Sequence, residues 1–229
     1  MHYQAENIID INQATCLLKN HYNIDGKLIP LPGEIDLNFK VKTANENTYV
    51  LKITELDENR TYLDFQEKIL LHLKNIEAPN IIKNSKGDFI TSFKDKTGKN
   101  HSIRLLSWVS GRVWSTVNPI TESLRESLGQ RCGEVTEKLK SFYHKYSQRY
   151  FEWDLSQSLW VENHFLLFDE EQNALLNPFL VSFKKFQKKY NKLRKGIVHN
   201  DANDNNIIVT NDLVNPKVIS LIDYGDAIY

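Results

Sequence analysis

Apolar and polar residues follow different patterns in the two halves of the chain. Residues 26–109 contain short runs in which apolar and polar positions alternate, as in half-buried strands. Beyond residue 111 the apolar positions recur at helical spacing. The pattern predicts strands at residues 28–31, 37–42, 48–53, 81–82, 88–93 and 101–109, and helices at 12–22, 58–73, 121–146, 158–168 and 178–193.

A strand-rich part followed by a helix-rich part predicts an α+β fold with two lobes joined by a short hinge. The change falls near residues 107–111. We therefore expect an N-lobe over residues 1–107, built from an antiparallel sheet with one main helix. A hinge and a mostly helical C-lobe are expected over residues 108–229. Pro178 is expected to open the last helix, because proline suits the first helical turn.

Composition limits the class of protein. Hydrophobic residues make up 41% of the 229 residues, which supports a folded core. Lys plus Arg and Asp plus Glu number 29 each, and this zero net charge argues against a nucleic-acid-binding protein. No apolar run reaches the roughly 18 residues of a membrane span, and the N-terminus lacks the features of a signal peptide. We expect a cytoplasmic protein that binds neither nucleic acid nor membrane.

The residues with the clearest chemistry lie near the C-terminal end, where two apolar runs flank a polar cluster. His199, Asp201 and Asn206 have the spacing H-x-D-x-x-x-x-N, and Asp223 ends the second run in D-x-G. Phosphoryl transfer needs a carboxylate near the attacking hydroxyl and oxygen ligands for Mg²⁺. Asp201 suits the first role, Asn206 and Asp223 suit the second, and His199 suits a hydrogen bond that holds the catalytic loop. The alternative is a set of ordinary polar turn residues.

A lysine on the third predicted strand is a second, independent element. The side chain of Lys52 can point into the cleft between the lobes, because strand side chains alternate between faces. Protein kinases place the lysine that holds the α- and β-phosphates on such a strand. Glu67 on the next helix is the expected partner, with Glu55, Glu58 and Asp64 as competitors. Taken alone, Lys52 is better explained as a solvated strand lysine, and Glu67 as one of several acids on a helix face.

The turn between the first two predicted strands, Pro32–Phe39, lies where a glycine-rich loop would cover nucleotide phosphates. It holds a single glycine, Gly33. The backbone N–H groups of this turn, together with Asn38, are candidates for phosphate contacts. A plain surface hairpin is the alternative.

These motifs together resemble the aminoglycoside phosphotransferase and choline kinase superfamily of small-molecule kinases. The resemblance rests on His199-Asn-Asp-Ala-Asn-Asp-Asn-Asn206 and Ile222-Asp-Tyr-Gly-Asp226. Three more segments are similar to its hydroxylysine kinase-like branch: Gly33-Glu-Ile-Asp-Leu-Asn-Phe39, Tyr49-Val-Leu-Lys-Ile53 and Arg104-Leu-Leu-Ser-Trp-Val-Ser-Gly111. The resemblance extends in consistent order over residues 12–226.

The resemblance implies a protein-kinase-like fold and a reaction. The γ-phosphoryl group of ATP or GTP would pass, with Mg²⁺, to a hydroxyl of a small molecule. Acceptors in this superfamily include hydroxylysine, homoserine, choline and aminoglycosides, which are often amines. Residues 106–111, with Trp108 and Val109, would contact the purine.

The resemblance also implies roles for the candidate residues. Asp201 would be the catalytic base, and Asn206 and Asp223 the magnesium ligands. Lys52 and Glu67 would form the clamp on the nucleotide phosphates.

Relatives in this superfamily continue past the D-x-G-D segment with further helices, whereas this sequence ends soon after it. We therefore expect an incomplete C-lobe, with exposed apolar surface on the helices at 121–146 and 178–193, fused to or completed by further C-terminal sequence. The alternative function is a truncated or degenerate kinase fold that binds nucleotide or a partner without turnover. The absence of G-x-G-x-x-G and A-P-E motifs counts against a protein kinase.

Overall fold

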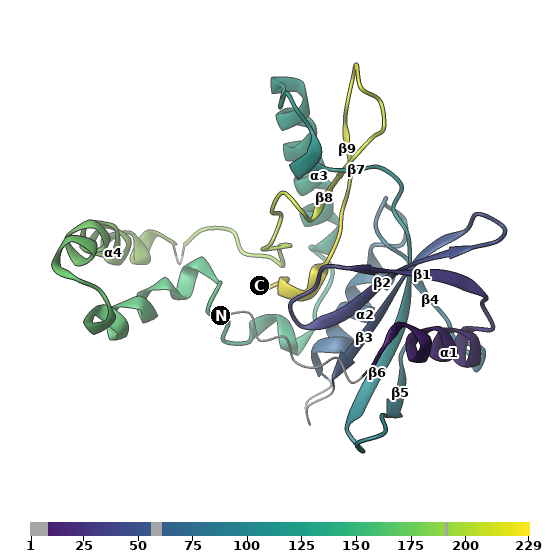
Figure 1. The fold of residues 1–229 in the computed structure, drawn as a ribbon. Coiled ribbons are helices and arrows are strands. Elements are labelled where there is room, and N and C mark those ends of the chain that lie inside the picture. The colour runs from purple at the N-terminus through teal and green to yellow at the C-terminus, as the bar shows by residue number, and fades with distance from the viewer. Residues whose placement is uncertain (1–8, 56–60, 191) are drawn as a thin grey trace.

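The computed structural model describes residues 9–55, 61–190 and 192–229 (Figure 1). Within these ranges the N-terminal part is a six-stranded antiparallel sheet in the order β1-β2-β3-β6-β4, with β5 also paired to β6. The strands are β1 Gly26–Leu31, β2 Asp36–Thr43, β3 Thr48–Glu55, β4 Ile81–Ile82, β5 Thr91–Lys94 and β6 Asn100–Ser107. The predicted antiparallel sheet is confirmed.

The two faces of this sheet differ, as alternation along each strand requires. One face packs against helix α1 (Ile11–Tyr22) in a buried apolar cluster. The sheet contributes Leu28, Phe39, Val41, Leu51, Ile53, Ile103 and Leu105 to this cluster, and the helix contributes Ala14, Leu18 and Tyr22. The opposite face carries Asn38, Lys52 and Arg104 in one cross-strand row. Helix α1 covers only the apolar face, and the polar residues of the other face line a cavity between the sheet and the helical part.

Helix α2 (Thr61–His72) joins the sheet to the helical part of the molecule. It shares a second buried cluster with helix α3 (Glu122–Leu139) and with a small sheet made of β7 (Arg112–Val113), β8 (Ile207–Val209) and β9 (Val218–Leu221). This cluster contains Phe65, Ile69 and Leu73 from α2 and Leu124, Val135 and Leu139 from α3. An antiparallel sheet followed by a helical part confirms the predicted α+β class. The small sheet positions the polar cluster, because residues 199–206 precede β8 and Asp223 follows β9.

Three predicted helices differ from the observed ones. The helix expected at residues 121–146 ends at Leu139, because Phe142 and Tyr146 leave the helical path and pack on Phe65, with ring centroids 6.2 and 5.7 Å away. The helix expected at residues 158–168 is instead part of a run of 3-10 turns, η3 (Leu155–Leu167), and Phe168 follows it in an extended conformation.

The third difference concerns helix α4 (Glu170–Tyr190), which has Pro178 in its interior and not at its start. The helix begins earlier because Asp169 and Gln172 cap it reciprocally: each side chain accepts a hydrogen bond from the other residue's backbone N–H. The helix expected at residues 58–73 is observed from Thr61 onward, and residues 56–60 lie outside the described residues.

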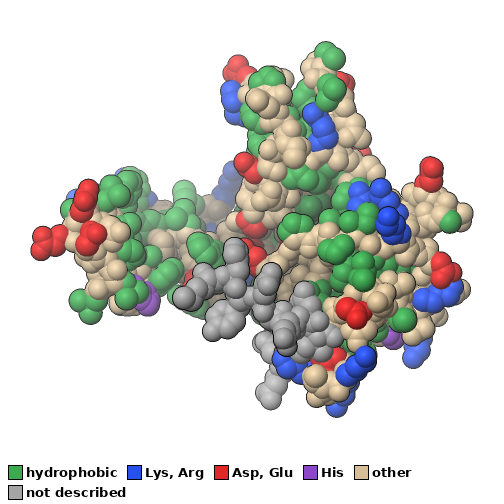
Figure 2. All heavy atoms as spheres, in the orientation of Figure 1, with side chains coloured by type: hydrophobic (Ala, Val, Ile, Leu, Met, Phe, Trp, Pro, Cys, Tyr) green, Lys and Arg blue, Asp and Glu red, His purple; other side chains and the backbone are tan. Residues whose placement is uncertain are grey.

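Helix α4 and η3 pack on each other and lie apart from the rest of the molecule in Figure 1. Along α4 only Leu180 is buried, whereas Leu175, Phe179 and Phe186 are exposed. Hydrophobic side chains are visible on the surface of this arm in Figure 2. The expected exposure of apolar surface is confirmed for α4 and wrong for α3. Across the part of the chain that the structure describes, we find no helix with the length and apolar character of a membrane span.

Candidate active site

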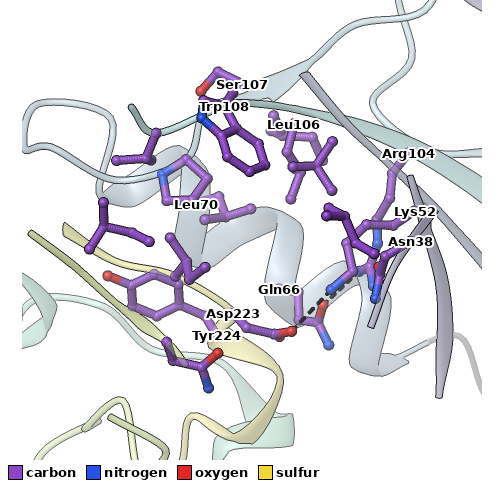
Figure 3. Close-up of a pocket in the computed structure, with 18 of the residues that line it drawn as sticks. Asn38, Lys52, Gln66, Leu70, Arg104, Leu106, Ser107, Trp108, Asp223 and Tyr224 are labelled. Atoms are coloured by element: carbon purple, nitrogen blue, oxygen red, sulfur yellow. Dashed lines mark hydrogen bonds and ion pairs between the residues drawn. The ribbon is translucent and has the colours of Figure 1, made fainter. Parts of the chain in front are cut away.

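A cavity of about 430 Å³ lies between the polar face of the sheet and the helical part. Its walls are mostly apolar side chains from β3, α2, β6, β8 and the segment after β9, and they include Val50, Leu63, Leu70, Leu106, Ile208 and Ile222. Figure 3 shows Trp108 and Leu70 on one side of the cavity and Lys52 and Asn38 on the other. The cavity therefore combines an apolar compartment with a charged end.

The segment after β6 closes the apolar end of this cavity. Trp108 and Val109 both line the cavity. The Trp108 N–H donates to the Thr48 carbonyl over 3.2 Å, whereas the Val109 N–H has no hydrogen-bond partner among the described residues. Gly111 lies so close to β8 that an added Cβ would come within 3.0 Å of the Val209 carbonyl oxygen. This glycine lets the segment after β6 pass directly against the small sheet.

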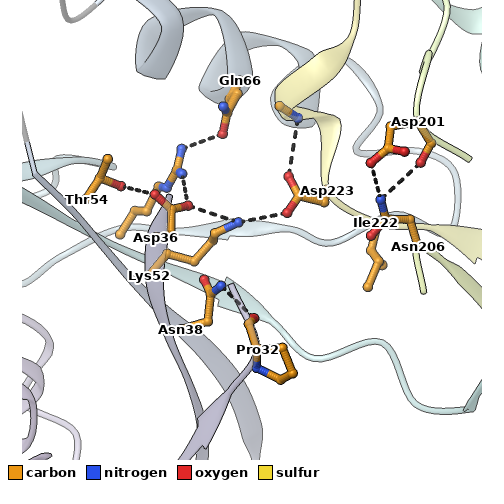
Figure 4. Close-up of polar contacts among 12 residues, drawn as sticks. Pro32, Asp36, Asn38, Lys52, Thr54, Gln66, Asp201, Asn206, Ile222 and Asp223 are labelled. Carbon is orange, nitrogen blue, oxygen red and sulfur yellow. Dashed lines mark hydrogen bonds and ion pairs between the residues drawn. The ribbon is translucent and has the colours of Figure 1, made fainter. Parts of the chain in front are cut away.

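At the charged end, Lys52 contacts two carboxylates at once (Figure 4). Its Nζ lies 3.1 Å from Asp36 Oδ2 and 3.1 Å from Asp223 Oδ2. Desolvation in the cleft raises the pKa of Asp223, but the charge and hydrogen bond of Lys52 outweigh this effect and hold that pKa below its ordinary value. Both carboxylates are therefore negatively charged near neutral pH.

Asp36 also binds residues on two neighbouring strands. Its Oδ2 accepts from Arg104 Nη2 over 2.8 Å, and its Oδ1 accepts from Thr54 Oγ1 over 2.6 Å. Arg104 Nη1 in turn donates to Gln66 Oε1 over 2.6 Å. Burial raises the pKa of Asp36, but the charges of Arg104 and Lys52 outweigh it, so that this pKa is lowered. One carboxylate, that of Asp36, therefore binds both Lys52 and Arg104 on the polar face of the sheet.

Glu67 is not the partner of Lys52, and the expected pair is wrong. Glu67 does line the cavity, where burial and the nearby charge of Asp64 raise its pKa. The competing acids are also occupied elsewhere, because Glu55 pairs with Lys99 and Asp64 with Lys68 and His144. Glu58 lies outside the described residues. The partner comes from β2 because Asp36 is two positions along that strand from the register neighbour of Lys52.

His199 is buried and holds the loop at residues 199–206 to the segment that follows β9. Its Nε2 lies 2.9 Å from the Ile222 carbonyl, to which it must donate, because a carbonyl only accepts. Its Nδ1 accepts from the Asp201 N–H over 3.3 Å. Both contacts require the neutral Nε2–H tautomer, and burial lowers the pKa of the ring. His199 thereby ties Asp201 to the segment that ends in Asp223.

The Asp201 carboxylate is positioned by two amides. Its Oδ2 accepts from Asn206 Nδ2 and its Oδ1 from Asn203 Nδ2, each over 2.7 Å. Asn206 Nδ2 also donates to the Asp201 carbonyl over 3.0 Å. Because Asn206 Nδ2 donates to Asp201, Oδ1 is the atom of this side chain that could coordinate a metal.

The donor set fits Mg²⁺, which prefers oxygen ligands and takes few of them from the protein when phosphates supply the others. The Asp223 side chain is 47% exposed to the cleft and stays ionised, and Asn206 Oδ1 adds a neutral oxygen. Among the described residues, no three His, Cys, Asp or Glu side chains gather into a metal site of their own. Mg²⁺ held by Asp223 and Asn206 would take its remaining ligands from phosphate oxygens and water.

A second, more polar cavity of about 840 Å³ adjoins the first. Asp201, Asp226, Arg149, Tyr150 and Trp153 line it. The residues that line both cavities are Pro32, Asn38, Lys52, Gln66, Arg104, Asn205, Asn206 and Asp223. The charged groups thus lie at the boundary between an apolar compartment and the compartment that holds Asp201.

The turn between β1 and β2 covers the second cavity. Asn38 Nδ2 donates to the Pro32 carbonyl over 3.0 Å and closes this turn. A Cβ at Gly33 would come within 3.0 Å of the Asp36 carbonyl oxygen, so that the close approach requires glycine. Asn38 lines both cavities, whereas Gly33 lines only the second.

A family model described as the phosphotransferase enzyme family matches residues 27–229. The chain belongs to this family. Hydroxylysine kinase of Mus musculus is 26% identical over 245 aligned residues, which cover 95% of this chain and 64% of that relative. The chain therefore spans less than two thirds of the length of that phosphotransferase. The superfamily and branch predicted from the motifs are confirmed.

Two solved structures share the fold. An amicoumacin kinase in complex with AMP-PNP, Ca²⁺ and Ami superposes with a TM-score of 0.73 at 17% identity, covering 100% of this chain and 67% of the other. A microcompartment-associated aminopropanol kinase superposes with a TM-score of 0.67 at 18% identity, covering 95% and 70%. At these identities the likeness shows the fold alone, and it confirms the protein-kinase-like architecture.

Asp36, Arg104 and Arg149 are among the residues of the site that were not predicted from the sequence. Arg149 Nη1 donates to the Ala227 carbonyl over 2.8 Å, and Nη2 donates to the Gly225 carbonyl over 3.3 Å. Its guanidinium also lies 4.6 Å from the Tyr146 ring centroid and 4.7 Å from that of Phe151. Arg149 thus holds the backbone that follows Asp223.

Proposed function

We propose that this phosphotransferase transfers the γ-phosphoryl group of ATP, with Mg²⁺, to a hydroxyl of a small amine. The observation that carries the proposal is the boundary between the two cavities. Lys52, Asn206 and Asp223 line both of them, and Asp201 lines the polar one. A nucleotide in the apolar cavity would direct its phosphates toward the side on which an acceptor meets Asp201.

The apolar cavity suits a purine. Leu70 and Trp108 offer apolar surface on one side, and the Val109 N–H is available for a ring nitrogen. Lys52 at the far end would neutralise phosphate charge, as phosphoryl transfer requires. We further propose that Asn38 and the backbone N–H groups of the turn at Gly33 contact the nucleotide phosphates.

Asn206 and Asp223 would hold Mg²⁺ against the phosphates. When bound, the ion neutralises the charge of the transferring phosphoryl group. Asp201 would accept the proton of the attacking hydroxyl, and the amides of Asn203 and Asn206 orient its carboxylate for this. His199 acts by positioning, because both ring nitrogens are already bonded within the chain.

An amine-bearing acceptor agrees with the charges of the second cavity. The acids that line it outnumber the cations: they are Glu34, Asp36, Asp201, Asp223 and Asp226, against Lys52, Arg104 and Arg149. Burial and the nearby charges of Asp201 and Asp223 raise the pKa of Asp226, as expected for an acid that lies among others. The mouse relative is a hydroxylysine kinase and a structural neighbour is an aminopropanol kinase. We therefore propose a hydroxylated amino acid or amino alcohol as acceptor.

Two measurements on the chain test this function. Calorimetry should detect binding of AMP-PNP in the presence of Mg²⁺, with GTP tested in parallel. ADP formation from ATP should then be stimulated by 5-hydroxylysine or 1-amino-2-propanol but not by lysine, which lacks the hydroxyl. Mass spectrometry should identify the phosphorylated amine. Nucleotide binding without product from any hydroxylated amine would instead favour a nucleotide-binding module without turnover.

A further inference from the structure

Asp36 was not among the predicted site residues, yet it contacts two buried cations on the polar face of the sheet. It joins three adjacent strands, because Asp36 lies on β2, Lys52 lies on β3 and Arg104 lies on β6. The three side chains are well buried, with 11%, 10% and 4% of their surface exposed. Asp36 is thus the buried counter-ion of two cations at the phosphate end of the cleft.

Lys52 and Arg104 are register partners on neighbouring strands, so two like charges lie side by side on one sheet face. Like charges opposite each other destabilise a sheet unless a counter-charge intervenes. Asp36 Oδ2 contacts both, at 3.1 Å from Lys52 Nζ and 2.8 Å from Arg104 Nη2. It shares one negative charge between the two cations.

Lys52 lies equally far from the buried Asp36 and the exposed Asp223, at 3.1 Å from each. If Asp36 lost its charge, Asp223 would be the sole carboxylate that contacts Lys52 among the described residues. Lys52 would then compete directly with a cation for the Asp223 oxygens. Asp36 therefore decides how strongly Lys52 engages Asp223.

We infer that Asp36 is the positioning residue for Lys52, in the role that the sequence assigned to Glu67. It holds the lysine at the phosphate end of the cleft and keeps Asp223 available to a divalent cation. The inference rests on the proposed function, which makes Asp223 a metal ligand. Asp36 lines the second cavity, and in this inference it acts through its contact with Lys52.

The test measures metal binding and not turnover. Mn²⁺ affinity is determined by electron paramagnetic resonance on the whole chain with saturating AMP-PNP. For Asp36→Asn we expect the Mn²⁺ dissociation constant to rise at least about tenfold, the size expected when a charged hydrogen bond is lost. Asp36→Glu should recover part of the affinity. The control is Asp95→Asn, which removes the carboxylate paired with His101 in the same sheet and should leave Mn²⁺ affinity unchanged.

A second variant covers the case in which Asp36→Asn fails to fold. Gln66 Oε1 already contacts Arg104, so Asp36→Asn with Gln66→Glu returns a negative charge to Arg104. No ion pair or hydrogen bond joins Gln66 to Lys52 among the described residues. This double variant should therefore fold and still bind Mn²⁺ weakly.

The outcomes separate the inference from the proposed function. If the wild-type chain binds no Mn²⁺ with AMP-PNP, the proposed function is wrong and the inference falls with it. If the wild type binds Mn²⁺ and a folded Asp36→Asn or Asp36→Asn/Gln66→Glu variant binds it as tightly as the wild type, only the role of Asp36 is refuted. A loss of affinity equal to that of Asp95→Asn would also reject it, because both changes would then act through stability alone.

Discussion

Gly111→Ala is expected to destabilise the protein through a single contact. An added Cβ would come within 3.0 Å of both the Val209 carbonyl oxygen and the Ile208 side chain, closer than real Cβ atoms approach such groups. The backbone oxygen belongs to β8, which pairs with both β7 and β9 and has little freedom to move. Overpacking of this kind costs about 1–3 kcal/mol. For a chain of this size, each kcal/mol lowers Tm by about 2–4 °C.

Urea and thermal unfolding measure this cost, and Gly129→Ala is the matched control. Gly129 lies within α3, and an added Cβ would meet nothing within 4 Å outside the helix's own backbone. The same substitution should therefore stabilise the protein there by about 0.5–1 kcal/mol, because alanine is the better helix former. Opposite signs are the expected result. A Gly111→Ala protein as stable as wild type would show that the segment after β6 does not lie against β8 as described.

Two further predictions concern the residues that hold the catalytic segment. Arg149→Ala should lower the free energy of unfolding by about 1.5–3 kcal/mol, because the Ala227 and Gly225 carbonyls lose charged donors. Arg149→Lys should recover only part of that free energy, since lysine lacks the planar guanidinium. An unchanged urea midpoint in Arg149→Ala would argue against these contacts. Burial lowers the pKa of His199 from 6.5, so below that pH the unfolded chain takes up a proton that the folded chain does not, and stability should decline by up to about 1.4 kcal/mol per pH unit until the folded pKa is reached. His199→Asn should remove that part of the pH dependence in urea unfolding between about pH 7.5 and pH 5, and an identical slope in wild type and variant would count against it.

The sheet and the main polar residues could be predicted because they depend on local pattern. Alternation along β3 puts Lys52 on the face opposite the apolar side chains, and the spacing of His199, Asp201 and Asn206 follows from one loop before a short strand. The start of helix α4 was predicted wrongly at Pro178. Proline only prefers the first helical turn, and here the cap formed by Asp169 starts the helix earlier. Local signals of similar strength cannot be ranked without the packing around them.

The partner of Lys52 could not be predicted, because it depends on how strands align. Asp36 reaches Lys52 only through the β2–β3 register, which places Asn38 directly opposite the lysine and Asp36 two positions away. Glu67 was expected as the partner because it lies on the helix that follows the Lys52 strand, and this order along the chain does not fix which side chains meet. Arg149 leaves even less trace in sequence, since its partners are backbone carbonyls of Gly225 and Ala227, which no residue type identifies.

The most direct test of the account compares wild type with Asp201→Asn in acceptor-stimulated ADP formation, at saturating ATP and Mg²⁺. The substitution keeps the shape of a side chain that lines the second cavity but removes the proton acceptor. We predict that nucleotide affinity stays within about twofold while the hydroxylysine- or amino-alcohol-dependent rate falls by about 10²–10⁴. Equal acceptor-stimulated rates in the two proteins would contradict the assignment of Asp201 as the base, and with it the proposed path of phosphoryl transfer across the two cavities.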